Sequence, residues 1–319
     1  MQTIPIAFFI VMLELSIGSY LVLYALDIRN DTSINFVRFQ AVLYLLMFTL
    51  LAWFTQQGFA NAPLLRGIGY HLDYVWLDRQ GPTLLWFMIL QAVYAVLLVR
   101  RSWRVARLVV GGGSALFGLI CLFSVGMGYR SIADANLGGA LTVFGFVSGA
   151  LALGGVSTAM LLGHWYLNTP TATGKPLEFS TILTIGGIVA QIAFGIFAGS
   201  TTYIAPATTT PTSSVISVTT AHTLNAPTTT IAATATPTTG AGKSTPSSAV
   251  PHGVQFNTLT LIIIEYLVGL GIPLGLSLIA LKLERERSFQ SATGMLYIAV
   301  VFAFFGEVLA RNLFLQPLI

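Results

Sequence analysis

The chain has 319 residues, of which 55% are hydrophobic and 8% are charged, and its mean hydropathy is +0.81. Soluble domains carry about 25% charged residues, so this composition excludes an ordinary soluble enzyme and predicts an integral membrane protein. The net charge of +4 comes mostly from arginines between apolar stretches, so we expect the lipid bilayer, and no nucleic acid, as a partner. The lone cysteine, Cys121, excludes an intramolecular disulfide and a cysteine-bound metal cluster.

Eight apolar stretches are long enough to cross a membrane as helices, which takes about 20 residues each. They are Ile4–Leu26, Phe36–Phe54, Thr83–Val99, Val105–Val125, Leu137–Leu162, Phe179–Gly199, Asn257–Leu281 and Ala292–Phe314. The fold class that this predicts is all-α and integral to the membrane, a bundle of eight transmembrane helices.

Lysine and arginine are distributed unevenly over the two sides of the predicted bundle. The loops after the first, third, fifth and seventh spans, with the adjoining helix ends, hold ten of the fifteen basic residues. Because cytoplasmic loops carry the excess of Lys and Arg, this side is predicted to be cytoplasmic. We therefore expect a multi-pass protein of a bacterial-type cytoplasmic (inner) membrane, with both termini extracytoplasmic.

The segment between the sixth and seventh spans differs from the rest in composition. Residues 200–256 are dominated by Thr, Pro, Ala and Ser and contain few large apolar side chains. Such a segment cannot bury enough surface to offset its ordering entropy, so we predict a disordered extracytoplasmic loop of mucin-like composition. Residues 1–199, with helices one to six, and residues 257–319, with helices seven and eight, are then expected to form one membrane domain.

Several charged residues lie inside the predicted spans. Glu307 and Arg311 are four residues apart in the eighth span, so they share one helix face and can pair. Glu14 lies in the first span and Glu265 in the seventh. Because a charge at membrane depth is costly, such residues are expected to face the bundle interior and often mark a functional site. The alternative is structural: Arg311 snorkels to the membrane surface, and the acids only pack against neighbouring helices.

Glycines four residues apart recur in three spans, a spacing that lets helix backbones approach closely in lipid. The pairs are Gly145 with Gly149, Gly195 with Gly199, and Gly271 with Gly275. We expect tight helix packing at these positions rather than a pore or a ligand groove. Pro273 in the seventh span predicts a kink, which a bundle tolerates where neighbours bond the freed carbonyl.

Two histidines lie near the predicted membrane surfaces. His164 ends the fifth span beside Trp165 and Tyr166, a grouping typical of an interfacial anchor; a hydrogen bond to a quinone or a lipid headgroup is the alternative. It has no obvious histidine partner, so a bis-histidine haem is not expected, while a His/Met ligand pair stays open. His71 lies in an aromatic-rich loop between the second and third spans, which indicates a surface helix or a lid over a quinone pocket.

Two short stretches resemble one family of membrane subunits. Residues 306–314, Gly-Glu-Val-Leu-Ala-Arg-Asn-Leu-Phe, resemble the Gly-Glu-x-x-x-Arg-x-Leu-Phe ending of the DMSO reductase anchor subunits, relatives of the NrfD/polysulfide reductase membrane subunits. Residues 61–66, Asn-Ala-Pro-Leu-Leu-Arg, with 76–79, Trp-Leu-Asp-Arg, resemble the family's loop between spans two and three. Eight spans with outward termini also match that family.

The resemblance implies a membrane anchor for an iron–sulfur subunit and a molybdopterin subunit, one that exchanges electrons with quinone and has no haem or metal of its own. In that role Glu14, Glu307 and Arg311 would shape a quinone pocket or proton path, with Arg66 and His71 at its outer mouth. The full set of candidate residues is Glu14, Arg66, His71, His164, Glu265, Glu307 and Arg311.

One departure from the family pattern keeps other functions open. The family loop has a histidine four residues before its proline, and Phe59 stands at that place here. Anchoring without quinone chemistry therefore stays an alternative. So do a proton- or ion-coupled transporter or channel that uses the same carboxylates, and a non-catalytic membrane scaffold.

Overall fold

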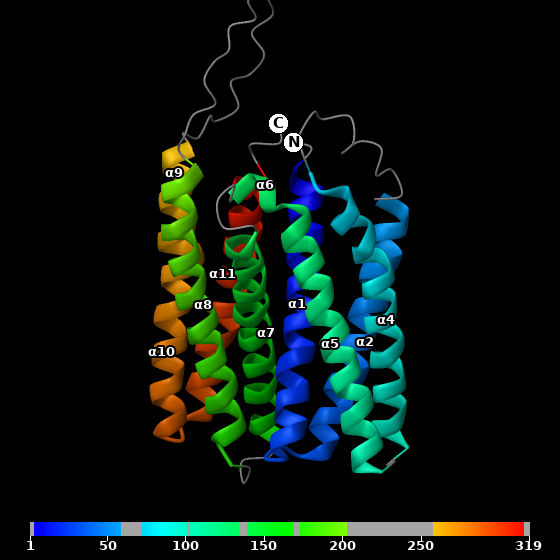
Figure 1. Ribbon diagram of the computed structural model, residues 1–319. Coiled ribbons are helices and arrows are strands. Elements are labelled where there is room, and N and C mark those ends of the chain that lie inside the picture. The colour runs from blue at the N-terminus through cyan, green and yellow to red at the C-terminus, as the bar shows by residue number, and fades with distance from the viewer. Residues whose placement is uncertain are drawn as a thin grey trace, which may run out of the picture. The chain divides into compact units, whose positions relative to one another are not determined.

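The computed structural model describes residues 3–58, 72–100, 103–133, 139–168, 173–202 and 258–315 (Figure 1). Within these ranges every regular element is helical, as predicted. The α-helices are α1 (Thr3–Arg29), α2 (Ile34–Gly58), α4 (Tyr74–Val99), α5 (Arg104–Gly128), α6 (Arg130–Ala133), α7 (Ala140–Asn168), α8 (Lys175–Thr202), α9 (Thr258–Ile264), α10 (Ile272–Arg285) and α11 (Phe289–Phe314). A π-helical segment, η1 (Glu265–Gly271), joins α9 to α10.

Seven helices of the described chain are long and apolar enough to cross a bilayer: α1, α4, α5, α7, α8, α11 and the continuous run of α9, η1 and α10. They correspond to seven of the eight predicted spans and make this an α-helical membrane protein. The remaining span predicted from the sequence lies in α2. All 25 residues of α2 are helical, but its described apolar stretch ends at Leu50.

The helix α4 begins at Tyr74 rather than at the predicted Thr83. Pro82 lies inside it, where the missing N–H and the ring usually interrupt a helix. Nevertheless the helix continues through Pro82, and the Thr83 hydroxyl donates to the carbonyls of Arg79 at 2.8 Å and Gln80 at 3.0 Å. Residues 74–79, which the sequence places in the loop before the third span, are therefore helical and continuous with α4.

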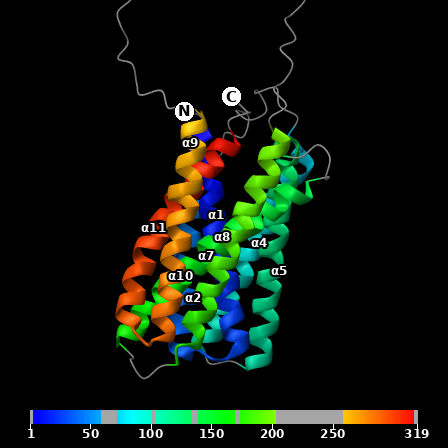
Figure 2. The ribbon, with the colours of Figure 1, turned by 90° about the vertical axis from the view of Figure 1, so that its left-hand side faces the viewer.

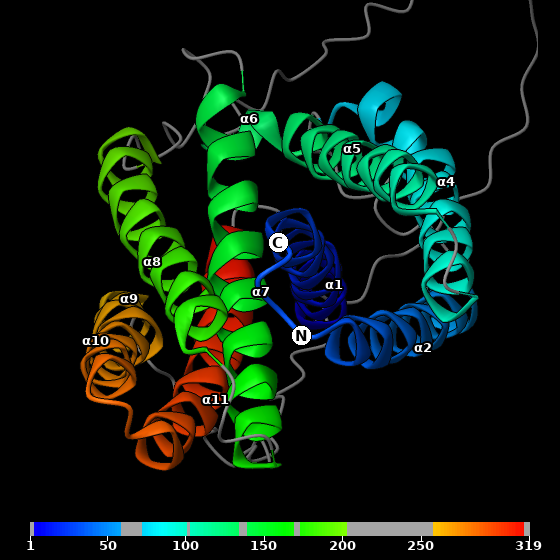
Figure 3. The same ribbon diagram turned by 90° about the horizontal axis from the view of Figure 1, so that it is seen from below.

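The central helices of the bundle are α1 and α7, with α2, α4 and α5 on one side and α8, α10 and α11 on the other (Figure 3). Glycine allows the central pair to touch. A methyl group on Gly18 would lie 1.8 Å from the Ala150 carbonyl oxygen, and one on Gly154 would lie 2.1 Å from the Gly18 carbonyl carbon. Any larger residue would therefore force the two backbones apart.

The glycine pairs predicted to pack closely do so in part. A methyl group on Gly145 would lie 2.8 Å from the Phe194 ring, and one on Gly195 would lie 1.8 Å from the Tyr266 hydroxyl. At Gly275, in contrast, an added methyl group would meet nothing within 4 Å. The prediction of tight packing is confirmed at the first two positions and wrong at Gly275.

The seventh predicted span is one continuous run of helix (Figure 2). Its winding changes in the middle, at η1. Pro273 has no N–H, so the carbonyl four residues before it, on Gly269, loses its α-helical partner. The helix widens just before this point, and the Ile272 N–H bonds the Leu267 carbonyl, five residues back. The disturbance predicted at Pro273 takes the form of the π-helical segment η1.

The two ends of the bundle are its upper and lower ends in Figure 1. At the upper end α1 begins and α11 ends, and at the lower end α8 begins and α10 ends. Helices that precede and follow the Thr/Pro-rich segment in the sequence pack against one another, since α11 contacts α1 and α7. The predicted disordered loop begins at residue 200, but residues 200–202 still belong to α8. Its remaining residues, 203–256, fall outside the described residues, as do Arg66 and His71.

Candidate functional site

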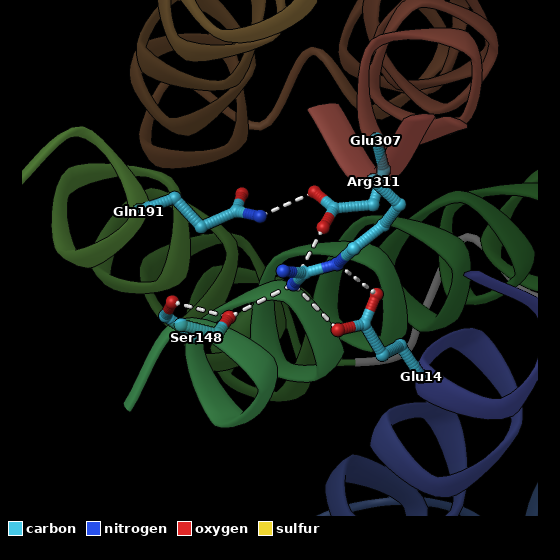
Figure 4. Close-up of polar contacts among 6 residues, drawn as sticks. Glu14, Ser148, Gln191, Glu307 and Arg311 are labelled. Carbon is cyan, nitrogen blue, oxygen red and sulfur yellow. Dashed lines mark hydrogen bonds and ion pairs between the residues drawn. The ribbon is translucent and has the colours of Figure 1, made fainter. Parts of the chain in front are cut away.

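Three charged side chains from two helices meet in the interior of the bundle (Figure 4). Arg311 on α11 donates to both carboxylate oxygens of Glu14 on α1, from Nη2 to Oε1 at 2.5 Å and from Nε to Oε2 at 3.2 Å. Glu307, one turn earlier on α11, places Oε1 2.8 Å from the same Nη2. The i,i+4 pair predicted from the sequence is formed, and Glu14 joins it from the other end of the chain.

Two further helices complete this network. From α8, the amide of Gln191 donates to Glu307 Oε2. From α7, the carbonyl of Gly145 accepts a bond from Arg311 Nη2 at 3.0 Å, and the same carbonyl accepts the Ser148 hydroxyl at 2.9 Å. The buried charges are thus held by four helices, and we refer to Glu14, Gln191, Glu307 and Arg311 together as the upper network.

The guanidinium group fits into space that α7 leaves free. A methyl group on Gly149 would lie 2.7 Å from Arg311 Nη2 and 2.9 Å from Glu307 Oε1. The ring of Phe146, also on α7, lies with its centre 4.4 Å from the guanidinium carbon, a cation–π distance. The close approach predicted at Gly149 therefore serves a side-chain network and not a contact between helix backbones.

The charged groups of the upper network are out of reach of the surface. The exposed fractions of Glu14, Arg311 and Glu307 are 0%, 2% and 3%, so Arg311 does not snorkel. Two carboxylates face one guanidinium, and ionisation of both would leave a negative charge uncompensated where the dielectric constant is low. Glu307 Oε1 lies within ion-pair distance of Arg311, but the contact does not have the geometry of a hydrogen bond. Such a site is suited to bind and release a proton.

Glu265 lies at the edge of the upper network. It is half-buried at the start of η1 and close enough to Glu307 and Arg311 to interact with them electrostatically. Facing glycines bring its helix to α11, since a methyl group on Gly306 would lie 2.3 Å from the Gly269 Cα. The structure thus gathers four of the seven candidate residues: Glu14, Glu265, Glu307 and Arg311.

The other candidate residues are not part of this gathering. His164 is exposed near the lower end of α7, with Nδ1 3.1 Å from the Tyr297 hydroxyl. At 1.5 Å of rise per residue, about 22 Å of helix separates it from Gly149. This position of His164 fits the predicted interfacial anchor and not a role in the upper network. Arg66 and His71 lie outside the described residues, so their role at an outer mouth stays a prediction.

A second buried ion pair, not predicted from the sequence, joins α1 to α5. Arg107 Nη2 lies 2.7 Å from Asp27 Oδ1, and the Tyr94 hydroxyl of α4 donates to Asp27 Oδ2 at 2.9 Å. The side chains of Arg107 and Asp27 are 10% and 3% exposed. By sequence Arg107 counts among the basic residues of the cytoplasmic side. The sequence signal for the burial of Arg107 is its position inside the fourth apolar stretch. For Gln191 of the upper network, the signal is its position inside the sixth stretch.

Among the described residues, no group of three or more His, Cys, Asp or Glu side chains is arranged to hold a metal ion. Comparison of the chain with family models, with curated proteins and with solved structures gives no match. The upper network and the sequence motifs are therefore the features that bear on function.

Proposed function

We propose that this protein is the membrane anchor subunit of a respiratory oxidoreductase, and that the upper network serves the proton side of its quinone chemistry. The observation that carries the proposal is the Glu14–Arg311–Glu307 cluster, buried inside a bundle of apolar helices. In this role the chain holds an iron–sulfur and a molybdopterin subunit at a bacterial-type cytoplasmic membrane.

The resemblance of residues 306–314 to the ending of DMSO reductase anchor subunits supports this role. The matching residues have definite structural roles, because Gly306 lets η1 approach while Glu307 and Arg311 pair. Reduction of a quinone takes up protons together with electrons, and oxidation of a quinol releases them. A buried cluster with more acid than base can exchange those protons inside the membrane.

The proposal includes eight membrane crossings and both termini on the extracytoplasmic side. Two observations support an even number of membrane crossings. The 25 residues of α2 span about 37 Å at 1.5 Å per residue, more than the ~30 Å hydrocarbon core. In addition, α1 begins and α11 ends at the same end of the bundle (Figure 1). The second span is then α2.

The test is isolation of the tagged full-length protein from its native membrane in mild detergent. We expect it to copurify with iron–sulfur and molybdopterin proteins and with extractable quinone, and the complex to oxidise a quinol analogue. Glu307→Gln should lower the rate of quinol oxidation while the subunits stay together. Glu178→Gln, which alters an exposed pair with Arg285 at the lower end, is the matched control. Purified protein with neither quinone nor a redox subunit would contradict the proposal.

A second candidate function is a proton- or ion-coupled transporter. The observation that favours it is η1, because many transporters interrupt a membrane helix next to their binding site, and Glu265 begins this segment beside the upper network. Solute uptake coupled to a proton gradient by the isolated chain in liposomes, without any redox subunit, would favour this candidate over the anchor.

A further inference from the structure

A second set of buried polar groups lies below the upper network, between α8 and α10. Thr181 on α8 donates to Glu284 Oε1 on α10 at 2.7 Å. Glu284 is only 4% exposed, and its other oxygen, Oε2, has no partner among the described residues. Two turns up the same face of α10, the Ser277 hydroxyl is fully buried and also has no partner there. We refer to Thr181, Ser277 and Glu284 as the lower polar group.

The burial of Glu284 is not explained by an ion pair. The nearby exposed acid Glu178 is 2.8 Å from Arg285, whereas no cation of the described chain lies within ion-pair distance of Glu284. Among the described residues, the only hydrogen bond to its carboxyl group comes from the Thr181 hydroxyl. A buried carboxyl group with a free oxygen costs stability, and its position in the last turn of α10 is within reach of the lower membrane surface. These features are those of a proton entry point.

One apolar layer separates the lower polar group from the upper network. It consists of Ala152 on α7, Ile188 on α8 and Leu270 on η1, which form a buried cluster apart from the main core. On α8 the order is Thr184, Ile188, Gln191, and all three side chains are buried. On the continuous run of α9, η1 and α10, Leu270 likewise lies between Glu265, on the side of the upper network, and Ser277 of the lower polar group.

The same order holds on α7. Gly149 contacts Arg311 and Glu307 of the upper network, and Gly155 contacts Thr184, with Ala152 between them. Three helices therefore agree on the sequence of layers: polar, apolar, polar. An apolar layer between two polar layers is the arrangement of a gate that closes by excluding water.

We propose that the buried polar groups of α8, α10 and α11, with the apolar layer between them, form a gated proton path from Glu284 to Glu307. A proton from water at the lower end binds Glu284 Oε2, passes the hydroxyls of Thr181 and Ser277, and reaches Glu307 of the upper network. Only a proton moves, and no bond between heavier atoms changes. The path does not rest on the redox partners of the proposed function, because it needs only this chain.

The gap at the apolar layer sets the condition for conduction. On α8 the path continues from Thr181 to the buried hydroxyl of Thr184, just below the layer. Thr184 and Gln191 are seven residues apart, about 10 Å along α8, whereas hydroxyl hydrogen bonds span about 2.5–3.0 Å. Conduction therefore needs a short file of water molecules past Ile188 and Leu270. Leu270 of the layer lies in the π-helical segment η1. Rewinding of this segment would turn Leu270 out of the layer, and π-helical segments are frequent at functional sites.

The experiment uses the full chain in liposomes that contain a pH-sensitive dye, with a potassium gradient and valinomycin to drive protons inward. Ile188→Ser places a hydroxyl in the apolar layer and should raise the proton flux severalfold above that of the wild type. Leu270→Ala, from the opposite wall of the layer, should raise it as well. Adding Glu284→Gln to either variant should return the flux to that of protein-free liposomes, while adding Glu178→Gln should not.

Two results would overturn the path. One is a flux that stays high in Ile188→Ser with Glu284→Gln, since protons would then enter elsewhere. The other is a flux at the protein-free level in both Ile188→Ser and Leu270→Ala, in protein whose Cys121 stays protected from thiol reagents. The protection would show that the variants are folded, and the apolar layer would then not be a gate. Loss of quinol oxidation or of copurifying subunits bears on the proposed function alone.

Discussion

Gly149 and Arg311 are matched in size: the guanidinium group of Arg311 occupies the place where any side chain at position 149 would begin. A methyl group on Gly149 would lie 2.7 Å from Arg311 Nη2. The size of one residue on α7 therefore decides whether the ion pairs between α1 and α11 can form.

We predict that Gly149→Ala destabilises the protein by about 1–3 kcal/mol, the usual cost of overpacking a well-filled interior. The added methyl group pushes Arg311 away from Glu14 and Glu307. The measurement is the midpoint of thermal unfolding in detergent. Gly186→Ala is the control, because a methyl group there meets nothing within 4 Å, and it should leave the midpoint unchanged or raise it. Equal effects of the two substitutions would contradict the packing described for Gly149.

The three charges of the upper network should differ in their contribution to stability. Removing Arg311 leaves two buried carboxylates without a cation, and breaking a buried pair in this way costs about 3–5 kcal/mol. Arg311→Gln should therefore lower the unfolding midpoint most. Glu14→Gln loses the two-pronged bond but keeps Glu307 as partner, so its effect should be smaller.

Glu307→Gln should cost least of the three, because Arg311 then keeps one fully bonded carboxylate, Glu14. The expected loss is about 1 kcal/mol, the value of one hydrogen bond. The same unfolding assay checks this order. If Glu307→Gln proves as damaging as Arg311→Gln, the charge balance inferred for the cluster is wrong.

Asp27 and Asp31 offer a comparison between a buried and an exposed pair near the same end of α1. Asp27→Asn leaves the charge of Arg107 buried without its partner and should cost about 3–5 kcal/mol. Asp31 pairs with Arg29 at 3.1 Å, but the side chains are 35% and 43% exposed. Asp31→Asn should therefore cost about 0–1 kcal/mol. Parallel unfolding curves of the two variants give the answer, and similar midpoints would mean that water reaches Asp27.

The number of crossings can be tested by fusing a topology reporter to each terminus in turn. Eight crossings place both termini on the same side of the membrane, and the excess of Lys and Arg on the opposite side predicts that this side is extracytoplasmic. A reporter active only in the cytoplasm should then be inactive at both ends. Activity at one terminus alone would mean an odd number of crossings and would exclude α2 as a span.

The sequence predicts well those features that depend on neighbours along the chain. The apolar stretches depend on composition, and seven of them are found as long apolar helices. The pairing of Glu307 with Arg311 depends on a spacing of four residues. The start of α4 could not be predicted in this way, because a proline normally interrupts a helix, whereas α4 continues through Pro82.

Partners from distant parts of the chain are equally out of reach of a single sequence. Glu14 and Arg311 are 297 positions apart, and nothing in either span specifies the other. Asp27 directly follows the first apolar stretch and Arg107 lies at the start of the fourth, and nothing in the sequence pairs them. Only the packing of α1 against α5 makes them a buried pair. The sequence therefore provides the candidate charges but not their assignment to one another.

Cys121 provides a probe of the folded state. It is the only cysteine of the chain, it is fully buried on α5, and its Sγ lies 3.9 Å from the Gln80 carbonyl oxygen of α4. Because reaction with a thiol reagent requires access to the sulfur, we predict that a maleimide dye does not label the native protein. Labelling should begin only as the protein unfolds, so the dye also reports the unfolding midpoints of the variants above. Rapid labelling of the native protein, at the rate of a free thiol, would mean that α4 does not cover this face of α5.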